Sequence, residues 1–93
     1  MKLLTKAIAK SLPKLGATEG TDAEVKVKFF TPWTTFTWFA SEFDGRDTFF
    51  GLVEGHEREL GYFSLSELEA IRGPWGLKVE RDLYFGNHKL SEV

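Results

Sequence analysis

The segment TFTWFASEFDGRDTFFG, Thr35–Gly51, decides the fold because it gathers six aromatic residues around a single Asp-Gly turn. Residues 36–43 and 48–54 have the aromatic and apolar content of β-strands. Gly45, in the Asp44–Asp47 link between them, can adopt the positive φ that a tight hairpin turn requires. The segment therefore predicts an antiparallel hairpin at the centre of the fold.

Alternation along the first strand places Phe36, Trp38 and Ala40 on one face and Phe39 and Phe43 on the other. The second strand is likewise apolar on both faces. A sheet of this kind has to be covered on both sides. We expect two short helices to cover one face and the C-terminal tail to help cover the other, with nearly all the rings in the core.

Working outward, Val25–Phe29 alternates apolar and charged residues and predicts a third strand, and Leu60–Phe63 predicts a fourth. Short links between successive strands favour an antiparallel meander. Thr31–Thr34, which contains Pro32, predicts a loop between the first two strands.

Two helices flank the meander. Thr5 can cap a helix that continues to Leu12, and Ser64 with Glu67 has the spacing of a capping box. Gly73-Pro74 ends the second helix. We therefore predict a small α+β fold of about four strands and two short helices, followed by an extended tail whose last eight residues fray.

The chain has 93 residues, which suffices for one compact domain, residues 1–93. It contains no cysteine, which excludes disulfides, thiolate nucleophiles and cysteine-based metal sites. Lys6 and Lys10 interrupt the N-terminal apolar residues, so we expect neither a signal peptide nor a membrane span, and a cytoplasmic location. The net charge of −2 argues against a general duplex-DNA binder.

No catalytic constellation, phosphate-binding loop or dinucleotide fingerprint occurs in the sequence. A metal site is conceivable at Glu54 and His56, or at Glu42, Asp44 and Asp47 beside the hairpin turn. The chain lacks a second nearby histidine, and turn acids commonly hydrogen-bond their own backbone. We predict no catalytic residues, no cofactor and no metal, with a metal-dependent hydrolase or nuclease as the least favoured reading.

Several segments together resemble one bacterial and phage family, domain of unknown function family 2958. They are MKLLTKAI with Leu12-Pro13, VKVKFFTP (25–32), EFDGRDTFFGLV (42–53), ELGYFSLSELEAIRGP (59–74) and GLKVERDLYF (76–85). The resemblance implies a compact cytoplasmic α+β domain found in phages, plasmids and other mobile elements. It transfers no catalytic residues.

Small size, an acidic balance and the lack of catalytic groups favour a non-enzymatic protein-binding module, acting as an inhibitor or modulator of a host or anti-phage defence complex. We expect a protein partner with a basic surface. The predicted partner-binding residues are Trp33, Glu42, Phe43, Asp44, Asp47 and Trp75.

The alternative is a nucleic-acid-associated protein of mobile-element replication or transfer. It would use Lys6, Lys10, Lys26 and Lys28 on phosphates and Phe30 as a stacking ring. A homodimer that covers the second apolar face also stays open.

Overall fold

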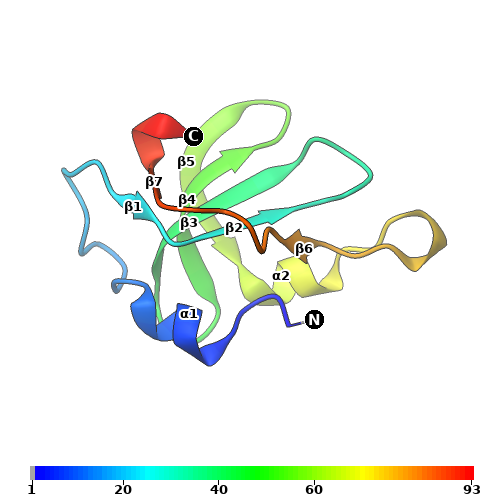
Figure 1. Ribbon diagram of the computed structural model, residues 1–93, viewed down its shortest axis with the longest axis horizontal. Coiled ribbons are helices and arrows are strands. Elements are labelled where there is room, and N and C mark those ends of the chain that lie inside the picture. Colours follow the sequence, from blue (N-terminus) through cyan, green and yellow to red (C-terminus); the bar gives the residue numbers. More distant parts are fainter. Residues whose placement is uncertain (1) are drawn as a thin grey trace.

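The computed structural model describes residues 2–93 and has an α+β fold (Figure 1). A five-stranded antiparallel sheet has the order β5-β4-β3-β2-β6, and a separate strand pair joins β1 to β7. The strands are β1 Glu24–Val25, β2 Val27–Phe30, β3 Thr37–Phe43, β4 Thr48–Glu54, β5 Arg58–Ser64, β6 Glu80–Arg81 and β7 His88–Lys89. The helices are α1 Lys6–Ser11 and α2 Leu65–Ala70, with the 3-10 turns η1 Pro74–Gly76 and η2 Leu90–Glu92.

Strands β2 to β5 form the predicted antiparallel meander. The link between β3 and β4 contains Gly45, whose φ is +85° as the turn requires. Strand β6 adds a fifth strand beside β2, and Arg81 in it donates hydrogen bonds to the carbonyls of Lys2 and Leu3, at 2.8 and 2.9 Å. This contact ties the start of the described chain to the end of the sheet.

Both helices begin at the predicted caps. Thr5 Oγ1 accepts the Ile8 N–H at 3.2 Å, and Ser64 Oγ accepts the Glu67 N–H at 3.0 Å. Capping by a short hydroxyl side chain satisfies an N–H group that has no partner within the helix. The helices are shorter than predicted because extended backbone at Leu12 and Ile71 ends them.

The two faces of the sheet are covered by different parts of the chain (Figure 1). On one face, apolar side chains of α1 and α2 join the sheet residues of the main core. This core includes Leu12, Phe29, Trp38, Phe49 and Leu68.

A smaller cluster lies on the opposite face, where Phe39 and Leu52 are covered by Phe85, Leu90 and Val93 from the C-terminal segment. The prediction that the last eight residues fray is therefore wrong. They are held because β7 pairs with β1 and because Leu90 and Val93, together with Phe85, cover the apolar surface of Phe39 and Leu52.

The prediction that the Phe43 side chain lies on the same face as Phe39 is wrong because β3 contains a β-bulge. The register between β3 and β4 shifts between Ala40 and Glu42, so Ser41 is an extra residue. The bulge reverses the alternation that follows it. Phe43 therefore joins the main core, where its ring stacks on Phe49 with the ring centroids 4.5 Å apart.

Candidate interaction surface

The most exposed large hydrophobic side chain of residues 2–93 lies at the tip of the loop Arg72–Lys78, between α2 and β6. Trp75 is 98% exposed there. Figure 1 shows this loop projecting from the right-hand side of the molecule. A free tryptophan side chain at the tip of a projecting loop leaves about 150–250 Å² of largely apolar surface in water.

The loop is nevertheless ordered by its own backbone. Arg72 and Lys78 form an antiparallel bridge at its base. The Gly73 N–H donates to the Leu77 carbonyl at 2.7 Å, and the Leu77 N–H donates to the Pro74 carbonyl at 3.1 Å. The indole is thus attached to a hydrogen-bonded turn, which restricts the positions that it can occupy.

Trp33 supports the base of this loop. A Cβ atom placed on Gly73 would lie 2.4 Å from an atom of the Trp33 ring, so the ring occupies the space that a side chain at position 73 would need. Trp33 is half-buried. The structure therefore assigns this predicted partner-binding residue a supporting contact with the loop that carries Trp75.

The backbone of Trp75 is strained. Its φ is +53°, and it is the only non-glycine residue in residues 2–93 with a positive φ. The left-handed region costs a residue with a Cβ about 1–2 kcal/mol. Such strain persists only where the surroundings impose it, and it gathers at functional sites.

A groove of about 340 Å³ runs beside the base of the loop. Its rim carries three basic side chains, Lys2, Arg72 and Lys78, against one acidic side chain, Glu69. Its apolar lining comes from Leu3, Leu68 and Val79. The groove beside the base of the loop is therefore mainly cationic.

The structure contradicts a surface role for Glu42. This side chain is only 3% exposed, and its carboxylate accepts hydrogen bonds from Gly16 N at 2.7 Å, Thr18 N at 2.9 Å and the Thr18 hydroxyl. Burial by itself raises the pKa of Glu42, but the hydrogen bonds from Thr18 and Gly16 outweigh it, and the pKa lies below its ordinary value of 4.5. Glu42 fastens the loop after α1 to strand β3.

The other residues predicted at the hairpin also serve the fold. Phe43 is 6% exposed in the main core, so the prediction that it contacts a partner is wrong. Asp44 Oδ1 accepts the N–H groups of Arg46, Asp47 and Thr48 at 2.7, 2.8 and 3.1 Å, and these bonds lower the pKa of Asp44. Asp47 accepts the N–H and the hydroxyl of Ser66, at 2.8 and 2.7 Å, and so holds the start of α2.

The chain's own donors therefore engage all three carboxylates of the predicted acidic surface. Within residues 2–93, no group of three or more His, Asp or Glu side chains is placed to hold a metal ion. Glu54 instead forms an ion pair with Arg58, and His56 packs edge-on against Phe36, with the ring centroids 5.5 Å apart.

The sequence model of the family described as "Protein of unknown function (DUF2958)" matches residues 2–93, which is nearly the whole chain. The chain belongs to this family. No curated protein and no solved structure matches it. Among the described residues, no helix is long and apolar enough to cross a membrane. The family's description names no function, so the function is argued from the surface.

The residues of the nucleic-acid alternative do not form one surface. Lys6 and Lys10 are exposed on α1, which packs on the main core. Lys28 lies over the Phe39 ring on the opposite face, 5.9 Å from its centroid, and pairs with Asp82 at 3.6 Å.

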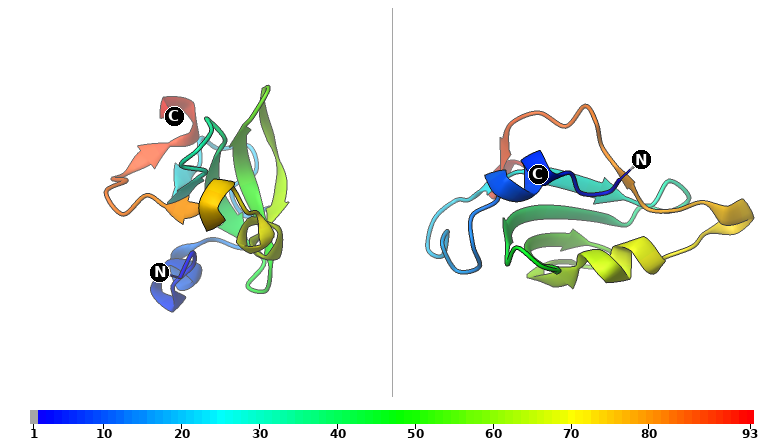
Figure 2. Two further views of the ribbon diagram at one scale, coloured as in Figure 1. Left: turned by 90° about the vertical axis from the view of Figure 1, so that its right-hand side faces the viewer. Right: turned by 90° about the horizontal axis from the view of Figure 1, so that it is seen from below.

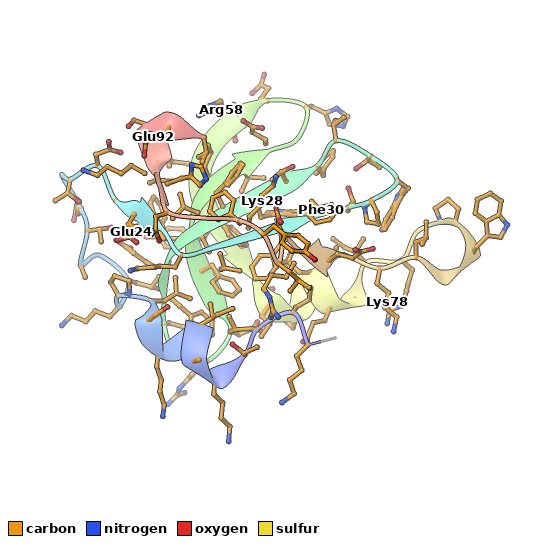
Figure 3. All side chains as sticks on the ribbon, in the orientation of Figure 1. Glu24, Lys28, Phe30, Arg58, Lys78 and Glu92 are labelled. Carbon is orange, nitrogen blue, oxygen red and sulfur yellow. The ribbon has the colours of Figure 1, made fainter. Side chains whose placement is uncertain are left out.

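The other two residues of that alternative also have acidic neighbours. Lys26 forms an ion pair with Glu24 at 3.4 Å. Phe30 lines a groove in which Glu80 and Asp82 balance Lys28 and Arg81. Figure 3 shows Lys28 and Phe30 near the middle of the molecule, apart from Lys78 at the loop.

Further exposed apolar residues were not predicted as candidates. Tyr84 is 94% exposed, Tyr62 69%, and Leu60 and Leu83 are both 60% exposed. For Tyr62 and Leu60 a usable signal was present: the strand Arg58–Ser64 is apolar at alternate positions and follows the last turn of the meander, as expected for an edge strand.

Proposed function

We propose that the chain is a small protein-binding module whose contact surface is the loop Arg72–Lys78, with Trp75 as the anchoring side chain. The observation that carries the proposal is the conjunction of full exposure and a positive φ at Trp75. Glycine at this position would relieve the strain and remove the exposed indole. A folding requirement does not account for a tryptophan there, whereas a binding role does.

Tryptophan is the side chain most typical of binding hot spots, because a rigid indole buries a large area at a small entropic cost. The closed turn and the support from Trp33 at Gly73 restrict the loop before binding. Restricting a contact residue in advance lowers the entropy lost on association. The loop thus has the chemical character and the order of a recognition element.

The charge around the loop indicates what the partner offers. Lys2, Arg72 and Lys78 surround the base of the loop, with Glu69 as the acidic exception. A complementary partner would hold the indole in an apolar pocket with an acidic rim. This proposal replaces the partner with a basic surface that the acidic balance of the chain suggested, since the hairpin carboxylates that would contact such a partner accept hydrogen bonds within the chain.

The experiment is a quantitative affinity capture from bacterial lysate with three tagged proteins: the unmodified chain, Trp75→Ala, and Tyr84→Ala as a control of matched exposure. Each is treated with nuclease. We expect a protein that survives nuclease, is held by the unmodified chain and Tyr84→Ala, and is lost with Trp75→Ala. Equal capture by all three proteins would contradict the proposal.

The identity of the captured protein tests the finer prediction, an inhibitor or modulator of a host or defence complex in the bacterial cytoplasm. What supports that prediction is the small size of the chain, its family resemblance and the lack of a catalytic constellation. If the captured protein belongs to no such complex, the proposed contact surface still stands, but the proposed role as an inhibitor or modulator is refuted.

A nucleic-acid function is the second candidate, and the cationic groove at the base of the loop that carries Trp75 is the observation that favours it. An exposed indole can stack on a base while Lys2, Arg72 and Lys78 contact phosphates. Affinity for single-stranded DNA or RNA would then fall steeply with salt and depend on Trp75. The absence of binding at low salt would eliminate this candidate.

A further inference from the structure

Strand β5 is the free edge of the main sheet. Within residues 2–93 it pairs only with β4, and its register against β4 is unbroken from Arg58 to Ser64. Figure 2 shows β5 at the outer side of the molecule, with α2 at one end of the strand and no segment beyond it. Its outward N–H and C=O groups are available to another strand.

Edge strands are usually protected against such pairing by lysine, proline, a bulge or short length. Strand β5, RELGYFS, is charged only at its first two residues, Arg58 and Glu59; it contains neither lysine nor proline, has no bulge, and is seven residues long. The other edge strand, β6, has only two residues. The edge formed by β6 is therefore protected by its short length, whereas the edge formed by β5 is protected only by the two charges at its start.

Neither a close contact nor a positive φ requires a glycine at position 61, in the middle of β5. A Cβ atom there would meet nothing within 4 Å, and its φ is not among the positive ones. Gly51, directly opposite on β4, differs: a Cβ there would lie 1.8 Å from the Phe39 carbonyl oxygen. A glycine inside a strand weakens it and commonly marks the close approach of another backbone.

The side chains beside Gly61 are apolar and exposed. Leu60 is 60% and Tyr62 69% exposed, and both lie on the sheet face that carries Phe50 and Leu52. The Tyr62 ring packs against Phe50 with the ring centroids 5.1 Å apart. Apolar groups on an unpaired edge strand are typical of a surface that is covered in the assembled protein.

We infer that β5 pairs antiparallel with the β5 of a second copy, around a twofold axis at Gly61. Gly61 is the central residue of the strand, so this register pairs all seven residues of each copy. Leu60 then lies opposite the partner's Tyr62 on both sides of the axis, on one face of a continuous ten-stranded sheet built from two five-stranded ones. Neither Arg58 nor Glu59 faces a like charge in this register, and the net charge of −2 per chain gives little repulsion.

Alternative symmetric registers are poorer. An axis at Leu60 leaves Phe63 and Ser64 unpaired and brings Arg58 opposite Tyr62. An axis at Tyr62 leaves Arg58 and Glu59 unpaired. An interface with twofold symmetry uses the same surface on both subunits. Pairing of β5 with β5 therefore occupies both edges and ends at a dimer.

Sedimentation equilibrium of the full chain tests the pairing, up to a concentration of about 0.5 mM, which exceeds the micromolar dissociation constants of weak interfaces. We expect twice the 10.6 kDa of the chain. Leu60→Lys should weaken dimerisation about 100-fold, because two buried leucines are lost per dimer. Leu83→Lys, at a side chain of equal exposure outside the interface, should leave it unchanged.

Disulfide cross-linking tests the register. Because the chain contains no cysteine, only the introduced thiols can react. Two cysteines introduced by Gly61→Cys face each other across the axis, with Cα atoms about 4.5–5.5 Å apart, and should form a disulfide on mild oxidation. Glu59→Cys places the two thiols about 13 Å apart along the strands and should not cross-link. A monomer at all concentrations, a dimer unaffected by Leu60→Lys, or equal cross-linking of both cysteine variants would overturn the inference.

Discussion

Glu42 provides the sharpest test of how the fold is held, because it is a buried carboxylate whose partners are all N–H or O–H donors. Glu42→Gln keeps the size of the side chain, removes its charge, and turns one accepting oxygen into an amide that donates. The lost interactions are hydrogen bonds from Gly16 and Thr18 to a charged acceptor, and the amide then faces a donor. We expect a loss of about 2–4 kcal/mol in the free energy of unfolding.

The pH dependence has a defined sign. Because the pKa of Glu42 in the folded protein lies below its ordinary value of 4.5, ionised Glu42 stabilises the fold at pH values above 4.5. This contribution is lost as the pH falls through the lowered pKa. A protonated Glu42 resembles glutamine, so the unmodified protein and Glu42→Gln should converge in stability at low pH.

Thermal unfolding followed by circular dichroism from pH 7 to pH 3 measures this difference. We expect Glu42→Gln to lower the Tm by about 10 °C or more at pH 7, since a domain of this size loses about 4–8 °C per kcal/mol. Glu19→Gln, at an exposed carboxylate in the loop that Glu42 binds, should change the Tm little at any pH. A Tm difference for Glu42→Gln that is absent at pH 7, or constant down to pH 3, would refute the reasoning.

Three further predictions concern the glycine and loop geometry, and each is tested by chemical denaturation. Gly51→Ala should prevent stable folding because its Cβ would overlap the Phe39 carbonyl, whereas Gly61→Ala should be tolerated; equal stability of the two would contradict this. Gly73→Ala should cost about 1–3 kcal/mol through overlap with the Trp33 ring, and Trp33→Leu in the same chain should recover part of that loss; an unchanged stability would count against the contact. Trp75→Gly should raise the stability by about 1 kcal/mol because it relieves the positive φ, and a clear loss would mean that the indole packs on the protein.

Local patterns of sequence predict much of this fold, and the reasons can be assigned to particular residues. Strand β4 occupies the predicted residues 48–54, because a run of apolar residues follows a turn that needs a glycine. Thr5 and Ser64 cap their helices as expected, since capping depends on residues only three apart. These features need no knowledge of distant parts of the chain.

Long-range features could not be predicted in this way. The bulge at Ser41 redirects Phe43, and nothing in the local pattern marks an extra residue. The pairing of β7 with β1 joins segments from opposite ends of the sequence. Burial of Glu42 depends on donors from residues 16–18, far from it along the chain, and an isolated glutamate is normally exposed.

The candidate surface was predicted in part. Trp75, between Pro74 and Gly76, was named as a partner-binding residue, and its near-complete exposure is consistent with that role. The acidic residues named with it instead hold turns and helix ends. From sequence alone, a carboxylate beside a turn could either accept hydrogen bonds from its own backbone or contact a partner. Only the positions of the nearby N–H groups in the structure distinguish these two roles.

The central claim, that Trp75 is the anchor of a protein contact, is tested most directly by nuclease-treated affinity capture that compares the unmodified chain with Trp75→Ala and Tyr84→Ala. The account predicts a stoichiometric protein that Trp75→Ala fails to hold and Tyr84→Ala retains. Capture that is the same for all three proteins, or that disappears with nuclease, would contradict it.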